Sequence, residues 1–167
     1  MINLNLCTLE NVGKVKFKKQ IDITDPCYDD DGKFRLKVKD FVKGNWNVIQ
    51  YRQENYIAGL EIVAEGYEKE DQKYDILYDD ICVDSGVCGF FDTKPNYDED
   101  EWYDICFIVD DEDTTIVEKE SAFKCNGVYT HSGYGDGRYA VYCKRNDKGE
   151  IYSLLLVFID EFDDEDE

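Results

Sequence analysis

Six side chains that could bind a ligand or a metal ion lie in three short segments rich in Asp and Gly. These segments are residues 22–28 (DITDPCY), 84–92 (DSGVCGFFD) and 132–139 (SGYGDGRY). Each adjoins a strand-like run, so all three could meet at one end of a sheet. Carboxylate oxygens gathered in this way suit Ca²⁺ or Mg²⁺. The candidate ligand or metal residues are Asp25, Asp84, Asp92, Ser132, Asp136 and Tyr139.

The same segments also have a purely structural interpretation as turns, where Asp caps backbone groups and Gly accepts a positive φ. Known loop motifs do not fit them. A calcium-binding loop aligned on Gly32 would place Cys27 and Val38 at ligand positions. The glycines at 133–137 do not form a dinucleotide fingerprint, and no phosphate-binding loop or serine-hydrolase motif occurs. No catalytic residue is assigned, and no cofactor is expected beyond Ca²⁺ or Mg²⁺ under the cation alternative.

The chain has seven cysteines but no CxxC pair, and a single histidine, His131. Zinc sites usually carry closely spaced pairs of Cys or His ligands. We therefore expect reduced, mostly buried thiols in a cytoplasmic protein. A lone histidine without a family signature is more often structural than a catalytic base.

The charge is strongly negative and unevenly distributed. The chain carries 19 Lys and Arg against 39 Asp and Glu, a net charge of −20. Residues 14–43 hold nine basic and six acidic residues, or +3, so the remainder carries −23. Such a charge repels the phosphate backbone and argues against direct nucleic-acid binding. The densest acidic run is Asp98, Glu99, Asp100, Glu101, Asp104, Asp110, Asp111, Glu112 and Asp113.

Two interpretations of this charge stay open. The acidic run could be a docking surface for a basic protein, since complementary charge speeds encounter and sets specificity. Alternatively, the surplus acids could simply maintain solubility. The basic face of residues 33–39 is either the protected edge of a sheet or a phosphate-binding patch. Its members are Lys33, Arg35, Lys37 and Lys39.

The elements that must position these residues are mostly strands. Alternation of basic and apolar residues predicts strands at 14–18 and 33–39. A continuous apolar run at 154–159 predicts a central strand that is covered on both faces. A hairpin turn is expected at 145–150, and the best helix candidate spans 97–103. Further strands are expected at 46–51, 56–64, 76–83, 105–109, 123–129, 139–144 and 151–159.

The predicted fold class is α+β and predominantly β, with an antiparallel twisted sheet or sandwich and one or two short helices. Residues 1–160 are expected to form one domain and residues 161–167 an acidic tail. No apolar run is long enough for a membrane helix, and no signal peptide is readable, so neither membrane association nor secretion is expected.

The three segments together resemble a bacterial and phage family catalogued only as a domain of unknown function. The similarity covers roughly residues 20–160, and its most specific part is SGYGDGRYAVY near the carboxyl end. Arg138 and the pronounced acidity depart from the family pattern. The resemblance implies a β-rich fold in a cytoplasmic protein, often of a mobile element, and implies no activity. Any common site would fall on the six candidate residues above.

These observations lead to three hypotheses of function. The first is a non-enzymatic acidic interaction protein that binds a basic surface, such as an inhibitor or an immunity or anti-defence factor. The alternative is a small-ligand or divalent-cation binding domain that uses the Asp cluster near the glycine-rich loop. The third is a hydrolase, which would need those carboxylates close together in a cleft.

Overall fold

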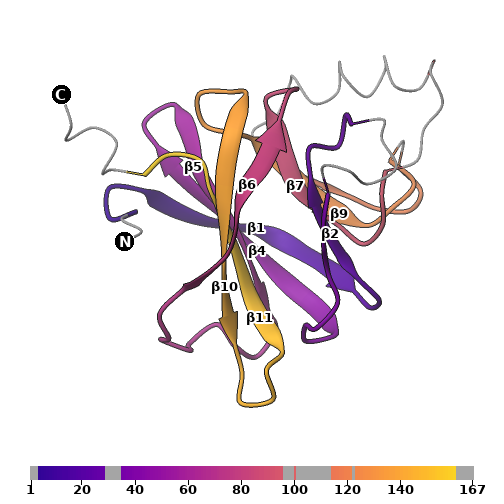
Figure 1. Cartoon of the computed structure of the whole chain (residues 1–167), viewed down its shortest axis with the longest axis vertical. Helices are drawn as coiled ribbons and strands as arrows, with labels where there is room; N and C mark the ends of the chain where they lie inside the picture. The colour runs from indigo at the N-terminus through magenta and orange to yellow at the C-terminus, as the bar shows by residue number, and fades with distance from the viewer. Residues whose placement is uncertain (1–3, 29–34, 96–99, 101–113, 122, 161–167) are drawn as a thin grey trace.

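The computed structural model describes residues 4–28, 35–95, 100, 114–121 and 123–160 and folds them into two antiparallel sheets (Figure 1). The larger sheet has six strands in the order β1-β4-β5-β11-β10-β6. Its strands are β1 (Thr8–Phe17), β4 (Gly44–Gln53), β5 (Tyr56–Ala64), β11 (Ile151–Val157), β10 (Gly137–Arg145) and β6 (Asp75–Val83).

The smaller sheet has five strands in the order β3-β2-β7-β9-β8. It contains the shortest strands, and its two edges are β3 and β8. Its strands are β3 (Leu36–Val38), β2 (Ile21–Thr24), β7 (Val87–Phe91), β9 (Gly127–His131) and β8 (Thr114–Val117).

The two sheets face each other and close a common core. Edge strand β1 lies against β8, and β2 lies against β6, so both margins of the larger sheet adjoin the smaller one. The alternation in β1 explains this arrangement, because Val15 and Phe17 are buried while Lys14 and Lys16 are exposed. The core also contains Trp46, whose indole N–H donates to the carbonyl of Val42 at 2.9 Å.

Strand β11 is buried on both faces, as its apolar run predicts. Leu154 and Leu156 point into the core between the sheets. Leu155 and Val157 pack on the opposite face, in a second cluster that includes Tyr51. The strand is therefore central both in the order of the sheet and in the packing.

The β10–β11 turn projects beyond the sheets at the lower end of Figure 1. The side-chain oxygen of Asn146 accepts hydrogen bonds from the backbone N–H groups of Lys148 and Glu150, each at 3.0 Å. The backbone N–H of Asn146 donates to the carbonyl of Glu150 at 2.9 Å. The predicted hairpin at 145–150 is confirmed, and its tip is held by its own hydrogen bonds.

Most predicted strands are confirmed. The run at 56–64 coincides with β5, and those at 46–51, 76–83, 139–144 and 151–159 correspond to β4, β6, β10 and β11. The run at 123–129 is wrong at its start, because β9 begins at Gly127 after a turn. The strand at 105–109, the helix at 97–103 apart from Asp100, and the tail at 161–167 lie outside the described residues. Within the described ranges every named element is a strand, and Asp100 alone has helical conformation.

The six described cysteines are free, and four of them are buried, as expected for small apolar side chains. Burial raises the pKa of the Cys125 thiol to about 12.

In the part of the chain that the structure describes, we find no helix with the length and apolarity needed to span a membrane.

Gly89 in β7 provides a test of how closely the strands approach. A Cβ added there would lie 1.9 Å from the carbonyl oxygen of Val128 and 2.7 Å from the Cα of Tyr129. Gly89→Ala should therefore lower the free energy of unfolding by about 3 kcal/mol, because the β9 backbone must shift. The neighbouring variant Cys88→Ala removes one buried sulfur atom and should cost only about 1 kcal/mol. Urea titration of both variants measures the difference; equal losses would contradict the close approach.

Candidate functional site

Three motif segments meet at one end of the sandwich, around the buried carboxylate of Asp25. Asp25 follows β2, and the β6–β7 turn crosses above it from the larger sheet to the smaller one. Its Oδ2 accepts the backbone N–H groups of Asp84 and Ser85 at 2.9 and 2.8 Å. Its Oδ1 accepts the Ser85 hydroxyl at 2.6 Å and the Cys27 N–H at 2.8 Å. Asp25 therefore anchors the turn that joins the two sheets.

Burial controls the ionisation of this carboxyl. Asp25 is only 1% exposed, and loss of water raises its pKa above the ordinary range. The hydrogen bonds from Ser85, Cys27 and Asp84 oppose this rise, because they favour the charged form. Four donors around one carboxylate satisfy the side chain within the protein, as a structural anchor requires.

The glycine-rich loop between β9 and β10 is tied to the same turn. The backbone N–H of Ser132 donates to the carbonyl of Gly86 at 3.0 Å, and its hydroxyl donates to the carbonyl of Gly135 at 2.7 Å. The Tyr139 hydroxyl lies 2.5 Å from that same carbonyl. Gly133 and Gly135 have φ values of 57° and 121°, in the region that glycine adopts without strain. Ser132 and Tyr139 therefore hold the loop closed.

Two of the predicted acids, Asp84 and Asp136, reach the surface beside this framework. They line a shallow depression of about 460 Å³, the motif pocket, together with Tyr28, Cys82, Val83, Gly137 and Arg138. The Tyr28 hydroxyl donates to the Asp84 carboxylate, and burial raises the pKa of that phenol above its ordinary value. The guanidinium of Arg138 pairs with Asp80 at 3.0 Å. The pocket therefore presents two carboxylates, a phenol and a paired guanidinium.

Asp92 lies away from the other candidates, at the opposite end of β7. Antiparallel pairing places Thr24 beside Gly89 and Asp22 beside Phe91, so Asp25 and Asp92 are separated along the strand. The Asp92 carboxylate accepts the Asn126 N–H at 3.0 Å, and burial raises its pKa. The structure thus groups Asp25, Asp84, Ser132, Asp136 and Tyr139, but not Asp92.

The described residues contain no group of three or more His, Cys, Asp or Glu side chains arranged to hold a metal ion. Asp84 and Asp136 are the two predicted acids that remain exposed near one another. They could contact a polar or cationic ligand, while Asp25 is engaged in the turn.

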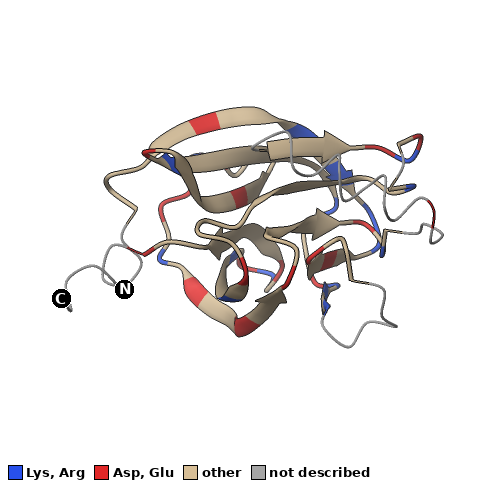
Figure 2. Cartoon of the chain, turned by 90° about the horizontal axis from the view of Figure 1, so that it is seen from above, with Lys and Arg blue, Asp and Glu red and all other residues tan. Residues whose placement is uncertain are grey.

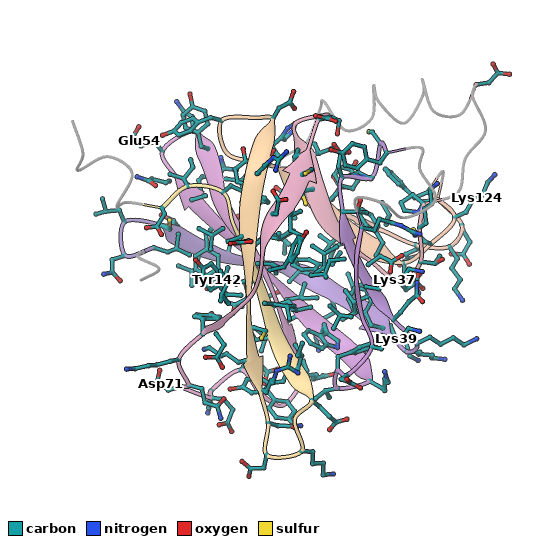
Figure 3. The ribbon with its side chains drawn as sticks, viewed as in Figure 1. Lys37, Lys39, Glu54, Asp71, Lys124 and Tyr142 are labelled. Atoms are coloured by element: carbon teal, nitrogen blue, oxygen red, sulfur yellow. The ribbon has the colours of Figure 1, made fainter. Side chains whose placement is uncertain are left out.

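The structure describes only some residues of the two charged surfaces expected from the sequence, the acidic run and the basic face. Of the acidic run, Asp100 alone lies within the described residues. In the basic face, Lys33 lies outside them, whereas Lys37 and Lys39 are exposed on or beside edge strand β3 (Figure 3). Arg35 instead points to buried Asp22, with Nη1 and Oδ2 3.0 Å apart.

A second buried carboxylate, Glu61, was not among the predicted site residues. It lies in β5 and accepts hydrogen bonds from the hydroxyls of Tyr51 at 2.6 Å, Ser153 at 2.7 Å and Tyr74. Burial, followed by the nearby Glu61 charge, raises the pKa of both phenols. The sequence could have indicated this buried carboxylate, because Glu61 is the one acid in the apolar run 56–64.

Comparison with known proteins gives one match. The model of a family described as "Protein of unknown function (DUF4241)" matches residues 20–156. This confirms the expected resemblance to a family of unknown function. No curated protein and no solved structure matches the chain.

The anchoring role of Asp25 can be tested by substitution. Asp25→Ala leaves three backbone N–H groups and one hydroxyl without their acceptor, so the free energy of unfolding should fall by about 3 kcal/mol. Ser85→Ala removes only one of the four hydrogen bonds and should cost about 1 kcal/mol. Chemical denaturation compares the two. The anchor is refuted if Asp25→Ala is no more destabilising than Ser85→Ala.

The raised carboxyl pKa values predict an unusual pH dependence. Burial raises the pKa of Asp22, Asp25 and Asp92, so between the ordinary and raised values the folded state holds more protons than the unfolded state. The free energy of unfolding should therefore decrease as the pH rises through this interval. Conversely, acidification through the same interval should raise the melting temperature. Carboxyl-carbon NMR of the three residues provides the check, and midpoints at or below the ordinary Asp value would contradict it.

Proposed function

The chain belongs to this family of unknown function, and we propose that it is a non-enzymatic interaction protein whose acidic segments bind a basic surface on another macromolecule. The partner would be a basic protein. The observation that carries the proposal is the uneven distribution of acids along the sequence, with nine of them between residues 98 and 113.

The described residues are close to electrical balance. They hold 18 basic and 22 acidic residues, a net charge of −4, and both signs occur along the strands (Figure 2). The remaining positions hold one basic and 17 acidic residues, a net charge of −16. Most of the excess therefore falls in three short stretches of sequence: residues 29–34, 96–113 and 161–167.

This separation favours recognition over general solubility. Acids that serve solubility alone can be spread over a whole surface. A dense local charge instead creates a strong potential, which accelerates encounter with an opposite charge and selects against acidic partners. The clustering of acids supports the docking interpretation.

An inhibitor, or an immunity or anti-defence factor of a mobile element, would use such a charge to cover a basic cleft. The free thiols of the six described cysteines support a reducing compartment such as the cytoplasm. The bacterial or phage setting is drawn from the resemblance of the motifs.

The motif pocket gives the ligand and hydrolase alternatives weaker support. A site there would depend on Asp84 and Asp136, since Asp25 is occupied by four donors and Asp92 lies at the other end of β7. The clustering of acids in the sequence therefore gives the docking proposal the stronger support.

Charge replacement tests the proposal. Replacement of six acids of the acidic run by Asn or Gln reduces the local negative potential. At low salt it should weaken binding to an immobilised basic protein such as cytochrome c at least tenfold. The six positions are Asp98, Glu99, Asp110, Asp111, Glu112 and Asp113.

A matched control separates local from net charge. It replaces six exposed acids of the sandwich, which changes the net charge equally, and should alter the affinity less than threefold. Its positions are Glu10, Glu54, Glu70, Asp71, Asp79 and Asp147. Equal weakening by both sets, or no binding by the unmodified chain at low ionic strength, would overturn the proposal.

A further inference from the structure

Positive charge gathers in one depression of this acidic protein. The depression has a volume of about 310 Å³, and we call it the lysine pocket. Figure 3 shows Lys124 on the same side of the molecule as Lys37 and Lys39, away from Glu54 and Asp71. The pocket is lined by five lysines, Lys16, Lys18, Lys19, Lys119 and Lys124, and by one acid, Asp92.

Three separate segments bring the lysines together. Lys16 lies in β1 beside buried Phe17 and is exposed, and Lys18 and Lys19 follow the end of that strand. Lys119 comes from the turn after β8, and Lys124 from the turn before β9. Lys124 has a φ of 57°, which is uncommon for a residue with a side chain. The convergence is therefore a product of the tertiary fold.

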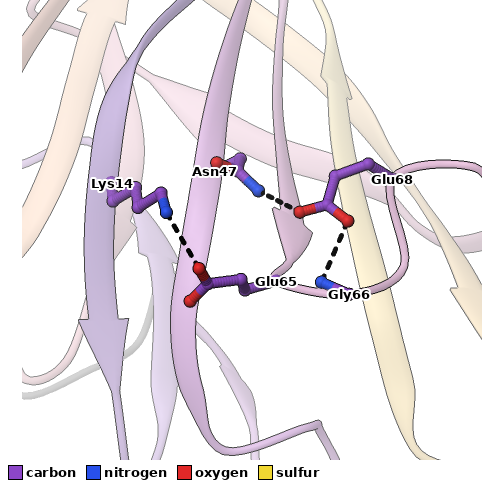
Figure 4. Close-up of polar contacts among 5 residues, drawn as sticks. All are labelled: Lys14, Asn47, Glu65, Gly66 and Glu68. Atoms are coloured by element: carbon purple, nitrogen blue, oxygen red, sulfur yellow. Dashed lines mark hydrogen bonds and ion pairs between the residues drawn. The ribbon is translucent and has the colours of Figure 1, made fainter.

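The neighbouring acids leave much of this positive charge uncompensated. In Figure 4, Lys14 forms an ion pair with Glu65 at 2.9 Å. No such pair is found for Lys16, Lys18 or Lys119 among the described residues. The Asp92 carboxylate accepts the backbone N–H of Asn126 and also interacts electrostatically with Lys119. An adjoining depression of about 370 Å³ is lined by Lys14, Lys16 and Lys119 together with Glu118 and Glu120, so both signs of charge occur there.

We propose that the lysine pocket binds a small ligand that carries two or more linked phosphate groups. Several converging ammonium groups match a multiply charged anion, and lysine binds phosphate as a point charge. The volume lies at the lower end of the range for small-molecule sites. A long nucleic acid would be repelled by the net charge of −20, whereas a small anion contacts only the local positive field. This site is independent of the proposed docking function.

Isothermal titration of the full chain with sodium tripolyphosphate and with ATP tests the proposal. We expect saturable binding of one ligand per chain by both, and much weaker binding of sulfate. Equal affinity for the two ligands indicates a site for the phosphate chain alone, whereas tighter binding of ATP indicates that the nucleoside also contributes. No heat and no shift in melting temperature with either ligand at millimolar concentration would overturn the proposal.

Variants locate the binding. Lys18→Gln and Lys119→Gln, each made singly at an exposed position, should weaken tripolyphosphate binding at least fivefold. The double variant Lys69→Gln/Lys148→Gln removes two exposed lysines elsewhere and should change the affinity less than twofold. Circular dichroism confirms that each variant is folded. Equal weakening by pocket and control variants would show a nonspecific charge effect and would also refute the proposal.

Discussion

The closure of the sandwich depends on the hydrogen bonds that the buried carboxylate of Asp25 accepts. The chain passes from the larger sheet to the smaller one through the β6–β7 turn, and the backbone N–H groups of Asp84 and Ser85 in that turn need acceptors. Asp25 supplies them from the end of β2. Burial of a charge opposes folding, while four hydrogen bonds compensate for the lost water. The position of the β6–β7 turn therefore depends on these four hydrogen bonds outweighing the cost of burying the Asp25 charge.

The strands with a clear two-residue period were predictable because one side of each must face the core. Val15 and Phe17 in β1 illustrate this, as does the continuous apolar run of β11, which packs on both faces. The start of β9 was not predictable, because Phe123 and Cys125 are buried within the turn before it, and apolar residues in turns and strands look alike in sequence.

The sequence indicated which residues form the candidate site better than it indicated what those residues do there. Asp and Gly in three segments indicated turns that could meet, and hydrogen bonds accepted by Asp25 and donated by Ser132 join them. The sequence could not reveal that Asp92 belongs to the other end of β7, since that depends on strand register. Convergence of Lys119 with Lys16 was equally hidden, because about a hundred residues separate them along the chain.

The β10–β11 tip offers a practical route for labelling this molecule. Asn146 closes the turn through local hydrogen bonds, and the tip projects away from both sheets (Figure 1). A fluorophore or a short affinity tag inserted between Asp147 and Lys148 would leave the motif pocket and the lysine pocket unobstructed, because neither pocket is lined by residues of this hairpin tip. The same position would suit attachment to a sensor surface in a defined orientation.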